Sequence, residues 1–365
     1  MTAHIIAAKR SPVAPRGGAL SRLTVHELGA PVLLAALADA GLSPEMVDEV
    51  IVGNALGAGG NPARMIALAA GLPERVAGLS IDRQCCGGLD ALILGAALIA
   101  SGQAQVAIAG GAESYSRRPI RLRTDPDGGD PVAYDRPPFV PFADRDPEMD
   151  AAADTLAQET GITQGEQDAW AVRSHARALA ADHSAEILPL NGLDRDAFAR
   201  NLRPALAARA PRLCGTISAA NAAVAADGAA FVVMVSDAIA QGLPDAGMVY
   251  RAGATLGDRP DMPGTAPIAA IRNVLHQADV PAGALHTAEI MEAYAIQALA
   301  CIRGAGIDPE IVNRGGGALA RGHPIGASGA INAVRLFHEL RNTGGTGIAA
   351  IAAAGGLGTA VLMSR

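Results

Sequence analysis

The chain has 365 residues, of which half are apolar, 18% are charged and only 3% are aromatic, and its formal net charge is −7. This length gives room for one large or two medium domains, whose cores must be built from small side chains because aromatic residues are so few. The acidic balance excludes the basic surface that binding to nucleic acid or to an anionic membrane would require.

Two further features lead us to expect a soluble cytoplasmic protein without a metal site. The four cysteines show neither metal-ligand spacing nor a paired framework, which fits a reducing compartment: Cys85, Cys86, Cys214 and Cys301. Residues 1–8 lack the pattern of a secretory signal, and the longest apolar stretch, residues 91–100, is too short to span a bilayer.

Segments with helical and strand-like periodicity alternate from the N-terminus. The pattern predicts a helix over residues 25–40, a strand over 47–53, a helix over 89–101 and a strand over 106–111. Because such alternation is typical of parallel sheets covered by helices, we predict a chain of the α/β class.

The alternation is interrupted in the middle of the chain. Residues 117–149 are rich in Pro, Asp, Gly and Arg and are predicted to be irregular, whereas helices are predicted over 151–160 and 164–183. The alternation resumes near Cys214. We therefore interpret residues 117–212 as an insertion that lies over the core.

Cys85 lies in a Gly-rich turn, residues 81–89, that leads directly into an apolar helix. A thiol at a helix N-terminus faces unpaired backbone N–H groups and the positive end of the helix dipole, and both favour the thiolate. The placement therefore suits a nucleophile. A buried cysteine in a tight turn is the alternative interpretation, and it is the commoner one for an arbitrary cysteine.

His323 is presented in the same way by a second Gly-rich turn, residues 315–329, which also precedes a helix. A cysteine and a histidine on two matched turns are the parts of an activated-thiol acyl-transfer site. A loose internal repeat supports this pairing, since turn, helix and a small-residue strand ending in two glycines occur in residues 85–111 and again in 323–356. Two similar halves packed face to face would bring both turns to one central site.

Motifs along nearly the whole chain make it resemble the thiolase family. The most specific is the block Gly-His-Pro-x-Gly-Ala-Ser-Gly at residues 322–329. The stretch at 82–89 resembles the family's Asn-Arg/Lys-x-Cys-x-Ser-Gly-Leu motif, with Cys85 at the nucleophile position. Three further stretches match a Gly-Gly-x-Glu-Ser/Asn motif, an Arg-Ser-His helix and an Asn…Asp-Gly-Ala-Ala segment: residues 110–114, 167–176 and 221–230.

The resemblance implies a fold and an assembly. Thiolases have two pseudo-repeated βαβαβαββ halves in a five-layer αβαβα core, with an inserted loop domain that covers a coenzyme A thioester. By this resemblance, residues 1–246 form the N-terminal half, with the insertion at about 117–212, and residues 247–365 form the C-terminal half. It also implies a homodimer or homotetramer, and a coenzyme A thioester as substrate with no permanently bound cofactor.

The resemblance further implies a two-step chemistry. Cys85 takes an acyl group from acyl-CoA, and a carbon nucleophile or CoA then resolves the acyl-enzyme. His323 stabilises the thiolate and donates a hydrogen bond to a thioester oxygen. The backbone N–H groups of Cys85 and Ala354 match the positions that form the family's second oxyanion hole.

Two catalytic positions of the family are replaced. Ala352 stands where a cysteine normally acts as acid and base at the acyl α-carbon, and Met291 stands where an asparagine holds a water in the enolate-stabilising oxyanion hole. A positioned acid or base contributes roughly 10²–10⁴-fold in rate and one oxyanion donor roughly 10²–10³-fold. Both losses fall on the enolate step, while the parts that acylate Cys85 are retained.

Other groups are not expected to replace the missing base. Cys86 should project away from Cys85, Cys214 and Cys301 align with ordinary positions, and Glu292 is expected to be structural. Coenzyme A phosphates are expected to meet a cluster of arginines near the insertion: Arg117, Arg118, Arg121 and Arg123. A solvated basic loop is the alternative interpretation of this cluster.

The sequence therefore predicts an acyl-CoA C-acyltransferase with an acyl-Cys85 intermediate, acting on a specialised 3-oxoacyl-CoA or on a pre-activated acceptor. A thioester hydrolase or an acyltransferase to oxygen, nitrogen or sulfur is one alternative. A non-catalytic CoA-binding partner subunit is the other, and the retention of Cys85 and His323 argues against it, because a scaffold needs neither.

Overall fold

The computed structural model describes residues 1–57 and 59–365. Within them a ten-stranded sheet runs in the order β12-β13-β14-β11-β1-β10-β5-β3-β4, with β2 paired to β10. Its strands are β1 (Ala3–Arg10), β2 (Ala14–Pro15), β3 (Glu49–Gly53), β4 (Leu79–Ile81), β5 (Val106–Ser114), β10 (Ala226–Ser236), β11 (Met248–Gly257), β12 (Thr287–Ile290), β13 (Thr346–Ala353) and β14 (Leu357–Ser364). Antiparallel pairing of β1 with β11 joins the two halves of this sheet.

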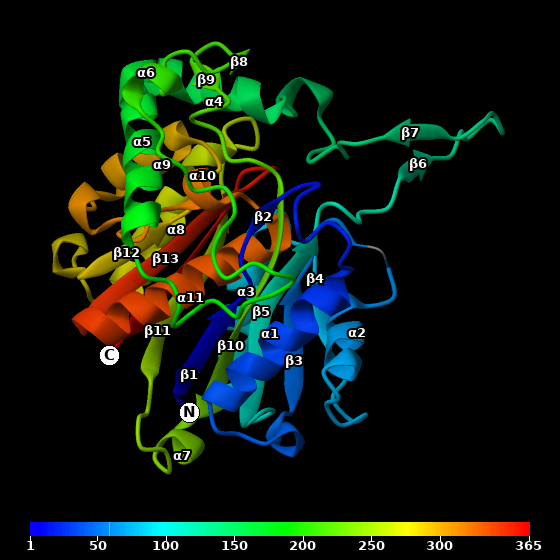
Figure 1. Cartoon of the computed structure of the whole chain (residues 1–365), viewed down its shortest axis with the longest axis vertical. Helices are drawn as coiled ribbons and strands as arrows, with labels where there is room; N and C mark the ends of the chain where they lie inside the picture. The colour runs from blue at the N-terminus through cyan, green and yellow to red at the C-terminus, as the bar shows by residue number, and fades with distance from the viewer. Residues whose placement is uncertain (58) are drawn as a thin grey trace.

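The helices arrange the sheet into five layers (Figure 1). α3 and α11 pack on each other between the two halves of the sheet, α1 and α2 cover the outer face of the N-terminal half, and α8 and α9 cover that of the C-terminal half. The helices are α1 (Val25–Asp39), α2 (Pro62–Ala69), α3 (Gly87–Ala100), α4 (Met149–Thr160), α5 (Gln164–Ala180), α6 (Pro204–Ala207), α7 (Asp237–Ala240), α8 (Ala266–Gln277), α9 (Ala295–Ala305), α10 (Ala318–Arg321) and α11 (Ile325–Thr343). This αβαβα order confirms the predicted fold class.

The core is built from small and branched aliphatic side chains, as the composition predicts. The central layer buries Leu89 and Leu92 of α3 against Ile331 and Phe337 of α11, and both faces of this layer pack on strands. Close approach of the central helices to the strands follows from side chains of this size. The central layer therefore holds both predicted catalytic turns in one rigid unit.

The helices and strands predicted from periodicity are confirmed to within a few residues. The helix predicted over 25–40 is α1, that over 89–101 is α3, and the strand predicted over 106–111 is the longer β5. Local signals explain this agreement at α5, where Thr163 Oγ1 accepts from Glu166 N at 3.3 Å and Glu166 Oε2 accepts from Thr163 N at 2.8 Å. This reciprocal capping box satisfies donors at the start of the helix.

The insertion contains more regular structure than its composition predicts. Two short strands, β6 (Arg121–Arg123) and β7 (Val132–Tyr134), pair antiparallel inside the stretch expected to be irregular, and this hairpin projects from the molecule as an arm (Figure 1). Another short pair, β8 (Arg212–Cys214) and β9 (Ile217–Ser218), follows α6. The predicted division between residues 246 and 247 falls just before β11 and stays a prediction.

Hydrogen bonds attach the insertion to the C-terminal half. Trp170 Nε1 and Ser174 Oγ, both on α5, donate to the two carboxylate oxygens of Glu292 at 2.9 and 2.8 Å. Glu292 also accepts from Asn313 Nδ2 at 2.8 Å and from Leu319 N at 3.2 Å, and it is fully buried. These contacts agree with the expected structural role of Glu292. None of the helices in the described ranges is both long and apolar enough for a membrane span.

Candidate active site

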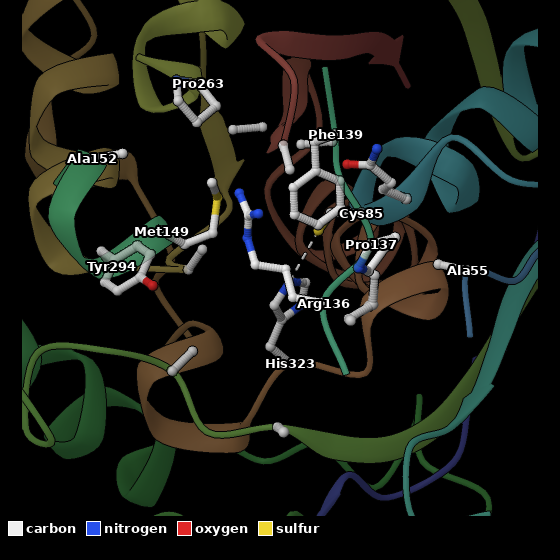
Figure 2. Close-up of a pocket in the computed structure, with 18 of the residues that line it drawn as sticks. Ala55, Cys85, Arg136, Pro137, Phe139, Met149, Ala152, Pro263, Tyr294 and His323 are labelled. Atoms are coloured by element: carbon white, nitrogen blue, oxygen red, sulfur yellow. Dashed lines mark hydrogen bonds between the residues drawn. The ribbon is translucent and has the colours of Figure 1, made fainter. Parts of the chain in front are cut away.

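The two Gly-rich turns meet at the centre of the molecule. Cys85 belongs to a short 3₁₀ turn, Gln84–Cys86, directly before α3, and His323 lies between α10 and α11. The Sγ atom of Cys85 is 3.2 Å from Nε2 of His323 (Figure 2). The structure thus brings together the two residues that the sequence singled out.

Glycine makes this approach possible. A Cβ atom added to Gly88 on α3 would lie 2.4 Å from the backbone N of Ala330 on α11, and one added to Gly329 would lie 2.7 Å from the backbone N of Leu89. Side chains at these two positions would therefore push the helices apart. The contact between bare backbones holds the two turns at hydrogen-bonding distance.

Ser328 determines the orientation of the imidazole. His323 Nδ1 lies 2.6 Å from Ser328 Oγ, and Ser328 Oγ is 3.3 Å from the carbonyl oxygen of Pro324. If the serine hydroxyl donates to that carbonyl, it accepts from Nδ1–H, and Nε2 keeps its lone pair toward the thiol. This assignment makes His323 able to accept the proton of Cys85.

The protonation of the pair differs from the expectation based on the helix dipole. Burial raises the pKa of the Cys85 thiol to about 12, and the charges of Glu113 and Asp82 act in the same direction. Burial likewise lowers the pKa of His323 to about 4. The backbone N–H contribution that the turn position predicts does lower the pKa of the Cys85 thiol, but loss of solvation outweighs it. Burial therefore favours the neutral form of both groups.

A buried carboxylate positions the neighbouring backbone. Glu113, at the end of β5, accepts from Asn54 Nδ2 at 2.8 Å, from Ala55 N at 2.9 Å and from Gly326 N at 2.9 Å. Burial raises its pKa to about 7, against the opposing effect of these donors. It joins the loop after β3 to the first turn of α11, and so supports the turn that carries His323.

A cavity of about 720 Å³ opens above the pair (Figure 2). Its walls come from both halves and from the insertion, and most are apolar: Leu56, Pro137, Phe139, Met149, Leu156 and Ile325. A mostly apolar cavity that ends on a thiol and an imidazole fits a flexible ligand with a reactive end. The size and lining are therefore those of a small-molecule site.

Some of the predicted positions line this cavity and others do not. Ala352 and Ala354, at the end of β13 and just beyond it, both line the cavity. Met291 is instead buried in the central hydrophobic core, outside the cavity lining. Cys86 is also buried, with Sγ donating to the carbonyl oxygen of Ile351 at 3.6 Å. Cys214 and Cys301 lie outside the lining as well.

Only one of the four predicted arginines reaches the cavity. Arg121 lines it and donates from Nη2 to the carbonyl oxygen of Ala55 at 3.1 Å. Arg118 is paired with Asp135 at 2.7 Å beside a neighbouring surface hollow. Arg117 and Arg123 are exposed and line neither space. The four arginines therefore do not line one common surface, and their contact with coenzyme A phosphates stays a prediction.

Sequence reasoning missed two groups in the cavity wall. Arg136 comes from the insertion and binds Asp146 through Nη1 at 3.1 Å and Nη2 at 2.6 Å. Tyr294 donates from its hydroxyl to Asp150 Oδ1 at 2.6 Å. The signal for Tyr294 was its position three residues after Met291, the family position that the sequence analysis singled out. No group of three or more His, Cys, Asp or Glu within the described ranges could hold a metal ion.

Comparisons with known proteins agree with this geometry. The thiolase N-terminal domain matches residues 3–238, and the thiolase C-terminal domain matches residues 246–365. An acetyl-CoA acetyltransferase of Cupriavidus necator is 38% identical over 393 residues, covering 99% of this chain and 98% of that protein. Human mitochondrial 3-ketoacyl-CoA thiolase has a TM-score of 0.93 at 30% identity, covering 100% of this chain and 98% of that one.

A thiolase of Ascaris suum, solved in complex with coenzyme A, has a TM-score of 0.92 at 30% identity over the full length of both chains. A doubled α/β core with a cysteine and a histidine at the end of an apolar cavity defines this protein as an acyltransferase. The chain belongs to the thiolase family.

Proposed function

We propose that this protein is an acyl-CoA C-acyltransferase that works through an acyl-Cys85 thioester, on a coenzyme A thioester substrate. The observation that carries the proposal is the 3.2 Å contact between Cys85 Sγ and His323 Nε2 at the end of the cavity. The names of the similar proteins, acetyl-CoA acetyltransferase and 3-ketoacyl-CoA thiolase, support the same class of substrate.

The acylation step begins from a neutral pair. Cys85 gives its proton to Nε2 of His323 as its sulfur attacks the carbonyl carbon of the acyl donor, so charge develops only when the donor is in place. The backbone N–H groups of Cys85 and Ala354 are proposed to stabilise the oxyanion of the tetrahedral intermediate. A deep apolar site strengthens these hydrogen bonds by excluding water.

The residues present for the step that forms or breaks the carbon–carbon bond support a particular kind of substrate. Ala352 brings only a methyl group to the cavity, and Met291 is part of the core. We propose a specialised 3-oxoacyl-CoA, or an acceptor that is already activated, as the natural substrate. We further propose that the protein acts in the cytoplasm as a homodimer or homotetramer.

Intact-protein mass spectrometry after incubation with a panel of acyl-CoAs tests the proposal. The expected result is a gain of one acyl group in the wild type and none in Cys85→Ala. Cys214→Ala is the matched control, because Cys214 is half-exposed and lies outside the cavity, and it is expected to load normally. If folded wild-type protein loads from no donor, the covalent mechanism is wrong and a non-catalytic role replaces it.

Analysis of the products separates the remaining alternatives. A loaded enzyme that forms a new carbon–carbon bond, or splits a 3-oxoacyl-CoA with CoA, is a C-acyltransferase. Release of the free acid identifies a hydrolase, and transfer to an alcohol, amine or thiol identifies a heteroatom acyltransferase. Either of these two results would overturn the C-acyltransferase proposal.

A further inference from the structure

Tyr294 and Asp150 form a hydrogen-bonded pair at the wall of the cavity. The Tyr294 hydroxyl donates to Asp150 Oδ1 at 2.6 Å, and the tyrosine lines the same cavity as Cys85 and Ala352. In Figure 2 the Tyr294 ring stands on the side of the cavity opposite Cys85, with its hydroxyl end turned toward the interior. Asp150, in the first turn of α4, does not line the cavity, so it lies behind the phenol.

The fold holds the phenol in place. Tyr294 directly precedes α9, its backbone forms a bridge with Ala222, and its carbonyl oxygen accepts from Ala298 N at 3.2 Å. Its ring packs on an apolar cluster that includes Leu156 and Ile296. A side chain fixed by its backbone and by packing can direct its hydroxyl at a defined point.

The other titratable groups of the described cavity wall have different partners, and Asp82, for example, accepts from Gln84 N at 3.0 Å. Cys85 and His323 form the proposed acylating pair, and Arg136 binds Asp146. Asp135 is paired with Arg118, whose guanidinium also stacks on the ring of Tyr115. Tyr294 differs from these groups because a carboxylate stands directly behind its hydroxyl.

We propose that Tyr294, backed by Asp150, moves the proton at the α-carbon of the CoA-bound acyl group, the step for which Ala352 provides no group. This inference rests on the proposed C-acyltransferase function in its 3-oxoacyl-CoA form, because a pre-activated acceptor needs no proton transfer at the α-carbon. Tyr294 is the residue that contacts substrate, and Asp150 is a positioning residue that acts through it. The sequence alone could not pair them, because 144 positions separate them.

The proton passes through the pair as a relay. The α-carbon–hydrogen bond breaks, its electron pair forms the enolate, and the proton bonds to the Tyr294 oxygen while the phenolic proton moves to Asp150. The enolate carbon then bonds to the acyl carbon of acyl-Cys85, and the bond from that carbon to sulfur breaks. Cys85 leaves as a thiolate and regains, by way of solvent, the proton that Asp150 releases. The reverse order protonates the enolate during thiolysis.

Burial and charge support a relay rather than a free tyrosinate. Burial of the ring, the hydrogen bond to Asp150 and the charge of Asp150 all raise the pKa of the Tyr294 phenol. The phenol therefore keeps its own proton at neutral pH and can accept another only as it passes the first one on. The half-buried Asp150 can exchange its proton with water, which completes the cycle.

Exchange of the acetyl-CoA methyl protons in D₂O, followed by NMR, tests the relay. Wild type is expected to exchange them, and Tyr294→Phe to do so at least about 100-fold more slowly. Tyr250→Phe is the matched control, because Tyr250 is a largely buried tyrosine outside the cavity, and it should exchange like wild type. Asp150→Asn should also slow exchange, and Asp150→Glu should recover part of the rate.

Two measurements distinguish a relay from a structural role. In Tyr294→Phe, loading of Cys85 in the mass-spectrometric assay should fall less than about threefold, so that the two half-reactions separate. Ala352→Cys in the Tyr294→Phe background should restore exchange, because it returns an acid and base to the strand end. Exchange in Tyr294→Phe at the wild-type rate, no rescue by Ala352→Cys, or no exchange by wild type that loads Cys85 would each overturn the relay. Failure of wild type to load at all would count against the proposed function instead.

Discussion

The thiol of Cys85 lies 3.2 Å from Nε2 of His323, and burial opposes charge on both partners. A thiol whose pKa is raised to about 12 and an imidazole whose pKa is lowered to about 4 face each other as neutral groups. In the proposed mechanism, the thiolate therefore forms together with the bond to the acyl donor. Water and small electrophiles in an empty site meet a thiol rather than a thiolate.

Alkylation of Cys85 by iodoacetamide should rise with pH by about tenfold per unit between pH 7 and pH 10. The thiolate is the reactive form, and its fraction increases as the pH approaches a pKa of about 12. Mass spectrometry of the labelled peptide measures the rate, and Cys85→Ala gives the background from other cysteines. If the alkylation rate has already reached a plateau by pH 8, the resting pair is ionised.

Ser328→Ala should slow loading of Cys85 roughly tenfold to a hundredfold. The change removes the 2.6 Å contact between Ser328 Oγ and Nδ1 of His323, so the imidazole is free to turn an N–H toward the thiol and lose its ability to accept. Stopped-flow loading by an acyl-CoA measures the effect. Ser236→Ala removes a 2.6 Å hydrogen bond from a fully buried serine outside the cavity and should leave loading unchanged.

Arg121→Ala should raise the KM for an acyl-CoA roughly tenfold, with kcat changed much less. Arg121 lines the cavity, and loss of one charge-assisted hydrogen bond to a CoA phosphate has about this effect on binding. Steady-state kinetics provides the measurement. Arg123→Ala, two residues along the same strand but exposed and outside the cavity, should keep the wild-type KM; equal effects of both changes would restore the arginine cluster as a unit.

Gly88→Ala should lower the free energy of unfolding by about 3 kcal/mol or more. The new Cβ would lie 2.4 Å from the backbone N of Ala330, so α3 and α11 must separate in the central layer. Urea unfolding measures the change. Gly283→Ala is the control, because a Cβ there meets open space, and it should stay within about 1 kcal/mol of wild type. Similar values for both variants would contradict the close-contact argument.

Local features of the sequence were sufficient to predict the fold and the acylating pair. The alternation of helical and strand-like segments predicts α1, α3 and β5, and β5 is buried along its whole length, so it stands in the sequence as a continuous run of small and apolar residues. Cys85 and His323 were predictable because each lies in a Gly-rich turn before a helix. The family motifs around them include the glycines that let the two turns touch.

Properties that depend on the three-dimensional surroundings of a residue, rather than on its neighbours in the chain, were decided by the tertiary structure. The raised pKa of Cys85 results from desolvation by walls drawn from both halves and the insertion, which outweighs the backbone N–H contribution that the helix position predicts. The separation of Arg121 from Arg123 depends on where the arm leaves the core. The pairing of Tyr294 with Asp150 depends on how α4 packs near α9, a contact between segments that no sequence periodicity relates.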